Sequence, residues 1–331
     1  MGQPMTRPLL IVLLAAACSR REPSPTPAPS THDAETVRSA PHLVLGTVEQ
    51  LSGRMPGDDS TPGQSTTAAF MHQGLVLHED HVLVANGSTL GVEDAEARAR
   101  DLAFLARADG VASNGRELVW RDRGSAFWVR RVGATRSIGS LASDAQFVAC
   151  NGSAWTWSPR SKRATRISLA DGASTRLPVN NVVTMRCFGD DAFVARADGS
   201  VVRVDASLGV HVLRPAHGEV RSAALFADAS GLVGSTGNGA FQCAADRCAL
   251  FAAPIPATAE LGANADAVCW TESDGVACVA RHGAGEVVRV ASQTSAQQPA
   301  TGIVVRKEDV TWSYMGFDGG VFRAPLRVVM R

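Results

Sequence analysis

Histidine and acidic residues gather in one short segment, His78-Glu79-Asp80-His81. Imidazole and carboxylate groups bind metal ions, so this segment is the first candidate for a metal site. Its spacing matches neither the HExxH helix of zinc enzymes nor a calcium-binding loop. We therefore predict a solvated turn between strands and no cofactor, and keep His78 and His81 only as metal candidates.

Linear catalytic motifs are missing from the sequence. It holds no G-x-S-x-G elbow, and the glycine-rich stretch 231–239 is not followed by the Gly-Lys-Ser/Thr of a phosphate-binding loop. We expect that stretch to be a hairpin. Catalytic residues could still converge from separate segments, and His211, His217 and His282 are then the residues to check.

Six cysteines besides Cys18 form an even set. Cys243 and Cys248 would face each other across a two-residue turn, and Cys269 and Cys278 would do so across a four-residue loop. The first pair lacks the second cysteine pair of a zinc finger, so we expect a bridge there.

Cys150 and Cys187 are the two cysteines left over. They are candidates for a third disulfide. Free buried thiols are the alternative for all three pairs, and for Cys150 with Cys187 this alternative is preferred. Disulfides would indicate an oxidising compartment.

Two tryptophans, Trp155 and Trp157, are two residues apart and would share one face of a strand. Such a pair could form a surface that binds a partner, because tryptophan is enriched where binding energy concentrates. The tryptophans at 120, 270 and 312 occupy equivalent places in a repeat and are expected to pack inside the protein.

That repeat organises the chain. A short apolar strand that ends in a small residue or tryptophan, with a glycine usually close behind, recurs seven times, with steps of 35, 29, 46, 39, 36 and 42 residues. This spacing suits one four-stranded antiparallel blade per repeat and predicts an all-β fold. The anchor residues are Ala85, Trp120, Ala149, Ala195, Gly234, Trp270 and Trp312.

Turn chemistry also favours hairpins. Nine Asn-Gly or Asp-Gly dipeptides occur, and they suit two-residue hairpin loops because those loops need positive φ. The best helical pattern, Val92 to Ala108, is interpreted as an insertion between strands. The dipeptides begin at Asn86, Asp109, Asn114, Asn151, Asp171, Asp198, Asn238, Asp274 and Asp318.

An apolar run starts at Leu9, follows Arg7, and ends in small residues before Cys18. It resembles the signal peptide and lipobox of a bacterial lipoprotein, which implies a signal peptide at 1–17 and a lipid on Cys18. The run is far shorter than the roughly 20 residues that span a bilayer. Ser19 is not the aspartate that retains some lipoproteins in the inner membrane, which favours the outer membrane.

Two alternatives to lipidation at Cys18 remain. Residues 1–6 fit the loose myristoylation pattern, and Cys18 could follow an ordinary cleavage site. Residues 18–41 are rich in proline and predict an extended tether. The net charge of zero, without a basic run, argues against binding to nucleic acid.

As a pattern, residues 42–331 resemble the seven-bladed β-propeller lipoproteins of GC-rich bacteria such as myxobacteria. The resemblance implies a monomeric propeller that is closed by pairing an N-terminal strand, His42 to Val48, with a C-terminal strand, Val321 to Ala324. Closure would remove exposed strand edges.

Two functions follow. The favoured one is a lipid-anchored lipoprotein of the bacterial cell envelope, whose propeller is a non-enzymatic binding platform for protein or glycan. The alternative is a propeller enzyme, a lyase or hydrolase, with its site at the central channel.

Overall fold

The computed structural model describes the ranges 42–53, 74–78, 81–85, 90–92, 108–122, 124–131, 133–244, 246–282, 286–292, 300–314 and 320–329. The chain divides into two units, Met1–Arg38 and Ser39–Arg331, and the described ranges all belong to the second. The predicted signal peptide, Cys18, the tether and residues 93–107 of the helical pattern lie outside the described residues.

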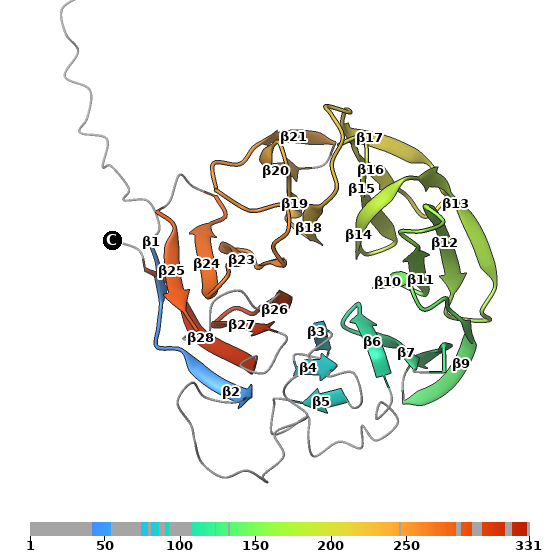
Figure 1. Ribbon diagram of the computed structural model, residues 1–331, viewed down its shortest axis with the longest axis horizontal. Coiled ribbons are helices and arrows are strands. Elements are labelled where there is room, and N and C mark those ends of the chain that lie inside the picture. Colours follow the sequence, from blue (N-terminus) through green and yellow to red (C-terminus); the bar gives the residue numbers. More distant parts are fainter. Residues whose placement is uncertain are drawn as a thin grey trace, which may run out of the picture. The chain divides into compact units, whose positions relative to one another are not determined.

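Every secondary-structure element of the described residues is a β-strand, as the repeats predicted. Correspondingly, these residues contain no apolar helix with the length needed to cross a membrane. The strands form seven antiparallel sheets (Figure 1).

Five of the sheets have four strands each, arranged in chain order. The first three are β6 (Ala108–Ser113), β7 (Glu117–Asp122), β8 (Ala126–Arg131) and β9 (Ala134–Ser140); β10 (Gln146–Cys150), β11 (Ser153–Trp157), β12 (Arg163–Ser168) and β13 (Ser174–Asn180); and β14 (Val182–Phe188), β15 (Asp191–Arg196), β16 (Val201–Val204) and β17 (Val210–Arg214). The other two are β18 (Ala223–Asp228), β19 (Gly231–Thr236), β20 (Gly239–Ala244) and β21 (Arg247–Leu250); and β22 (Leu261–Ala263), β23 (Ala267–Thr271), β24 (Gly275–Ala280) and β25 (Val288–Ala291).

The remaining two sheets differ from the predicted four strands. One has three strands in the described residues, and the other has five because both N-terminal strands pair with β28. Their strands are β3 (Gly74–His78), β4 (His81–Ala85) and β5 (Leu90–Val92); and β26 (Ala300–Val305), β27 (Asp309–Tyr314), β28 (Gly320–Val329), β1 (His42–Leu45) and β2 (Glu49–Gly53).

One edge strand of each sheet, here called an inner strand, contacts the inner strands of the two neighbouring sheets. The contacts run through β3, β6, β10, β14, β18, β22 and β26, and β26 contacts β3 again. Within this unit the sheets therefore follow one another around a common centre (Figure 1).

The N-terminal strands complete the last sheet. Leu45 is opposite Leu326 and Glu49 is opposite Arg323, so β1 and β2 together run along β28. A strand near the N-terminus does pair with the C-terminal strand, as predicted, but the residues differ. His42–Leu45 pair with residues 326–329, and the segment around Val321 pairs instead with β2.

The third repeat was placed in the wrong strand. Ala149 lies in β10, an inner strand, whereas the other six anchors lie in the second strands of their sheets. The corresponding position in β11 is Thr156. With Thr156 as the third anchor, the steps from Trp120 and to Ala195 become 36 and 39 residues in place of 29 and 46. The error arose because β10 and β11 are two adjacent strands of similar apolar character.

Most of the predicted turn dipeptides lie between strands, and Gly152, with φ of 58°, has the positive φ that such turns need. Asp109-Gly110 is an exception because it lies within β6 at a shift of the strand register. The dipeptides at Asn86 and Asp318 lie outside the described residues. The glycine-rich stretch is the β19–β20 hairpin, as expected.

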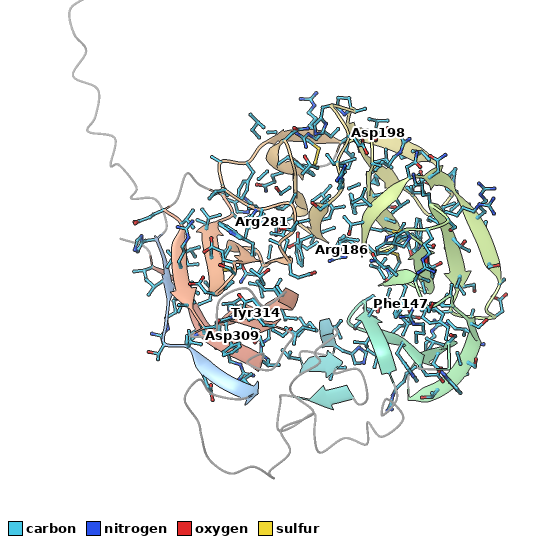
Figure 2. The ribbon with its side chains drawn as sticks, viewed as in Figure 1. Phe147, Arg186, Asp198, Arg281, Asp309 and Tyr314 are labelled. Carbon is cyan, nitrogen blue, oxygen red and sulfur yellow. A yellow bond between two sulfur atoms is a disulfide. The ribbon has the colours of Figure 1, made fainter. Side chains whose placement is uncertain are left out.

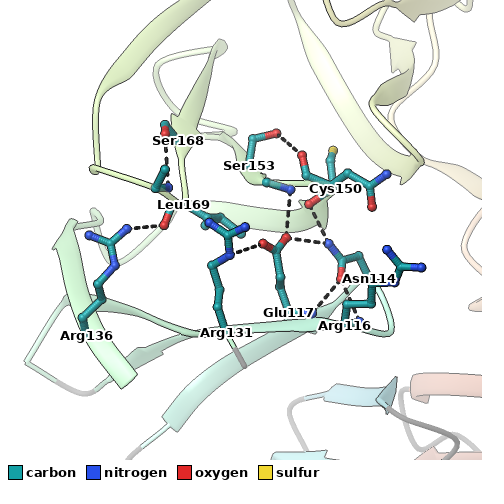
Figure 3. A network of polar contacts seen from close by, with 12 residues as sticks. Asn114, Arg116, Glu117, Arg131, Arg136, Cys150, Ser153, Ser168 and Leu169 are labelled. Carbon is teal, nitrogen blue, oxygen red and sulfur yellow. Dashed lines mark hydrogen bonds and ion pairs between the residues drawn. The ribbon is translucent and has the colours of Figure 1, made fainter. Parts of the chain in front are cut away.

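Polar contacts join neighbouring sheets as well (Figure 3). Asn114 Nδ2 donates to the carbonyl of Cys150 at 2.7 Å and to Glu117 Oε2 at 2.9 Å. Glu117 also accepts the Gly152 amide at 2.8 Å and pairs with Arg131 Nε at 2.6 Å. This buried carboxylate therefore fixes the β6–β7 turn against the β10–β11 turn.

Candidate binding cavity

A cavity of about 420 Å³ lies at the centre of the sheets. All seven inner strands contribute to its lining, and most of the lining side chains are aliphatic or aromatic, including Phe147 and Phe226. A cavity of this size falls in the range of small-molecule sites, roughly 300–1,000 Å³. Figure 2 shows Phe147 and Arg186 on strands that border the centre.

One ion pair interrupts this apolar lining. Arg186 Nη2 of β14 lies 3.6 Å from Glu260 Oε2, and about a third of each side chain is exposed (34% and 36%). Arg186 Nη1 also donates to the carbonyl of Met185 at 3.0 Å. The backbone of Glu260 is held by Thr271, whose hydroxyl accepts the Glu260 amide at 3.0 Å. Arg186 is thus held by a backbone carbonyl as well as by Glu260, and Thr271 fixes the backbone of Glu260 beside it.

A second hollow of about 300 Å³ lies where β14 and β18 begin, and we call it the mouth hollow. Arg186 and Glu260 line both the mouth hollow and the central cavity, so the two spaces meet at the ion pair. The mouth hollow adds the exposed Arg221 and the hydroxyl groups of Thr184 and Thr258. A more polar space therefore adjoins a more apolar one.

The candidate metal residues His78 and His81 are opposite each other in the β3–β4 register. His78 Nδ1 is 2.9 Å from the hydroxyl of Ser113, which lines the central cavity. The described residues contain no group of three or more histidine, cysteine or acidic side chains that could hold a metal ion. The side chain of His81 and the predicted turn at 79–80 lie outside the described residues, so His78 and His81 stay candidates only.

The three histidines considered for catalysis lie apart from the central cavity. His211 Nε2 is 2.8 Å from Asp205 Oδ2 at the edge of one sheet, and His217 Nδ1 is 3.0 Å from the carbonyl of Pro215. His282 is exposed beyond β24. None of the three is part of the described cavity lining.

The cysteines form three disulfides. Cys243 pairs with Cys248 and Cys269 pairs with Cys278, each directly across a hairpin, as the spacing predicted. Cys150 and Cys187 are also bonded, so the preference for free thiols there was wrong. Their bond joins the neighbouring inner strands β10 and β14, a proximity that sequence spacing could not show.

The possible partner surface at Trp155 and Trp157 is not present, because these side chains are 0% and 3% exposed. Trp155 Nε1 donates to the hydroxyl of Ser153 at 2.9 Å, and both indoles belong to a core that includes Met185 of the next sheet. A sheet between two neighbours has no free face for such a surface. Trp270 and Trp312 are buried too, and Trp120 is 2% exposed, as expected.

Sequence reasoning did not single out Arg186, Arg221 or Glu260. One signal was available, because Arg186 is the only charged residue of the apolar segment Val182–Phe188. A lone arginine in an otherwise apolar strand marks a position that is either paired or functional.

No family model matches the chain, and the search of curated proteins finds no match either. Solved structures do match its fold. The WD40 repeats of RRP9 have a TM-score of 0.58 at 12% identity, covering 86% of this chain and 100% of that one.

Two further structures agree with this result. U3-55K has a TM-score of 0.57 at 12% identity, covering 84% of this chain and 98% of that one. The N-terminal domain of Nup159 has a TM-score of 0.51 at 12% identity, with coverages of 85% and 95%. Sheets that follow one another around a centre, together with these matches, define the chain as a β-propeller.

Proposed function

We propose that this chain is a lipid-anchored lipoprotein of the bacterial cell envelope, and that its seven sheets act as the blades of one closed propeller that binds protein or glycan. The central cavity carries the proposal. All seven inner strands line it, and its described charged groups are one arginine and one glutamate that pair with each other. A concave space lined mainly by aliphatic and aromatic residues, with few charged groups, is typical of ligand-binding sites.

The anchoring part of the proposal rests on residues 1–18. The apolar run that ends at Cys18 resembles a lipobox, and the three disulfides fit an oxidising compartment outside the cytosol. Ser19 favours the outer membrane. The proposed domains are the signal peptide at 1–17, the tether at 18–41 and the propeller at 42–331.

Metabolic labelling tests the anchor. Cells that express the full chain are supplied with a labelled fatty-acid precursor, and the wild type is compared with Cys18→Ser. We expect the wild type to incorporate the label and to be found in the membrane fraction. The variant should do neither. Equal labelling of both chains would contradict lipidation at Cys18. Label found on Gly2 would favour myristoylation instead.

Site-specific photo-crosslinking in cells tests the platform. The probe replaces Thr258, which is exposed at the mouth hollow, or the control residue Ala249, which is exposed on the outer strand β21. We expect a discrete crosslinked species, with protein or glycan attached, from position 258 and not from position 249. Identical patterns at both positions would contradict a binding face at this end of the propeller.

A further inference from the structure

The central cavity and the mouth hollow have complementary chemistry. The cavity offers aliphatic side chains and the rings of Phe147 and Phe226, whereas the mouth hollow offers hydroxyl and guanidinium groups. They meet at Arg186 and Glu260, which line both. A molecule that occupied both spaces would need an apolar body and a polar end.

The charges on the described lining decide the sign of that polar end. The two spaces together hold Arg186, Arg221 and Glu260, which leaves one positive charge in excess. Glu260 pairs with Arg186, while the exposed guanidinium of Arg221 makes no hydrogen bond or ion pair with the described residues. Guanidinium groups bind carboxylates through paired N–H donors, so an anion fits this position better than a cation.

We propose that the propeller binds a small organic acid whose carboxylate lies between Arg186 and Arg221 and whose aromatic or aliphatic body fills the central cavity. Glu260 holds the guanidinium of Arg186 in place at the junction. The volume of about 420 Å³ accommodates a body the size of a phenylalkyl group. This ligand goes beyond the proposed protein or glycan partner, although both proposals use the central cavity.

Isothermal titration calorimetry with 4-phenylbutyrate tests the proposal on the full-length protein in detergent. We expect saturable binding of one equivalent, and binding about tenfold or more weaker for the neutral 4-phenylbutyramide, because the amide lacks the charge that the arginines recognise. Acetate, which lacks the apolar body, should not bind measurably. Added salt should weaken the binding of the acid more than that of the amide.

Arg221→Gln is the decisive variant, since Arg221 has no partner among the described residues whose loss could disturb the fold. It should weaken the binding of 4-phenylbutyrate about tenfold and that of the amide much less, because the amide loses a neutral hydrogen bond and no charge interaction. Arg247→Gln, which changes an exposed arginine on the outer strand β21, is the matched control and should bind as the wild type does.

Val148→Trp fills the cavity from a partly exposed position in its lining and should abolish binding of both the acid and the amide. Unchanged thermal unfolding would show that this variant is folded. The proposal is overturned if 4-phenylbutyrate does not bind at millimolar concentration, if acid and amide bind equally, or if Arg221→Gln behaves like Arg247→Gln. The crosslinking experiment at Thr258 tests the macromolecular partner, and its result does not decide whether the small acid binds.

Discussion

Arg281 pairs with Asp228 across the boundary between two neighbouring sheets. Its Nη2 lies 2.7 Å from Asp228 Oδ1, its Nη1 contacts the other carboxylate oxygen, and Nη1 also donates to the carbonyl of Asn264 at 2.8 Å. The side chain of Arg281 is 0% exposed and that of Asp228 is 23% exposed. The guanidinium of Arg281 is therefore a buried charge that is neutralised by Asp228 of the adjacent sheet.

We expect Asp228→Ala to destabilise the protein by about 3–5 kcal/mol, because the substitution leaves Arg281 buried without its counter-charge. The double variant Asp228→Ala/Arg281→Met should recover part of that loss, since it removes the buried charge as well. Urea unfolding measures both free energies. A double variant less stable than Asp228→Ala alone would contradict this account of the pair.

The disulfides should differ in their contributions to stability. Replacing Cys150 and Cys187 by alanine should lower the free energy of unfolding by about 4 kcal/mol, and replacing Cys243 and Cys248 by about 2 kcal/mol, because the first bond closes a longer loop. The sequence separations are 37 and 5 residues. Chemical denaturation under non-reducing conditions compares the variants, and equal losses would show that loop closure does not set the difference.

The N-terminal strands should matter far more than the tether. Deletion of residues 42–50 removes β1 and the start of β2, which pair with β28, together with Leu43, which is 3% exposed. We therefore expect a loss of at least about 3 kcal/mol. Deletion of 19–40 should leave the melting temperature nearly unchanged. Scanning calorimetry of the two truncations decides, and equal melting temperatures would reject the role of this strand pairing in stability.

Acid should destabilise the fold through aspartates that accept serine hydroxyl groups. Ser200 Oγ lies 2.5 Å from Asp198 Oδ1, and this hydrogen bond holds the pKa of Asp198 below its ordinary value. Ser158 lowers the pKa of Asp144 in the same way. Because these pKa values are lower in the folded state, the unfolded chain binds more protons in acid. The stabilisation is complete above about pH 4 and is lost as pH falls toward the folded values.

Ser200→Ala tests this pH dependence. The variant should be slightly less stable than the wild type at neutral pH, and it should lose less stability between neutral pH and about pH 3. Urea midpoints at the two pH values measure the effect. Thr135→Ala, at an exposed position of β9, serves as the control and should keep the pH dependence of the wild type. If Ser200→Ala lost as much stability in acid as the wild type, this hydrogen bond would be excluded as a source of the pH dependence.

The sequence by itself determined the features that depend on near neighbours. Short runs of apolar residues form strands, Asn-Gly and Asp-Gly supply the positive φ of hairpin turns, and Cys243 and Cys248 face each other because the turn between them is short. The repeat predicted the β fold even though Ala149 was assigned to the wrong strand of its sheet. Each of these relationships is decided within a few residues.

Only the tertiary structure decided which distant residues meet. Arg186, Arg221 and Glu260 come together because three sheets pack side by side, and the bond between Cys150 and Cys187 forms for the same reason. Trp155 looked like a surface residue because strand periodicity identifies a shared face but not what covers it. In this propeller the neighbouring sheet covers it, and such packing depends on contacts between segments that lie far apart in the chain.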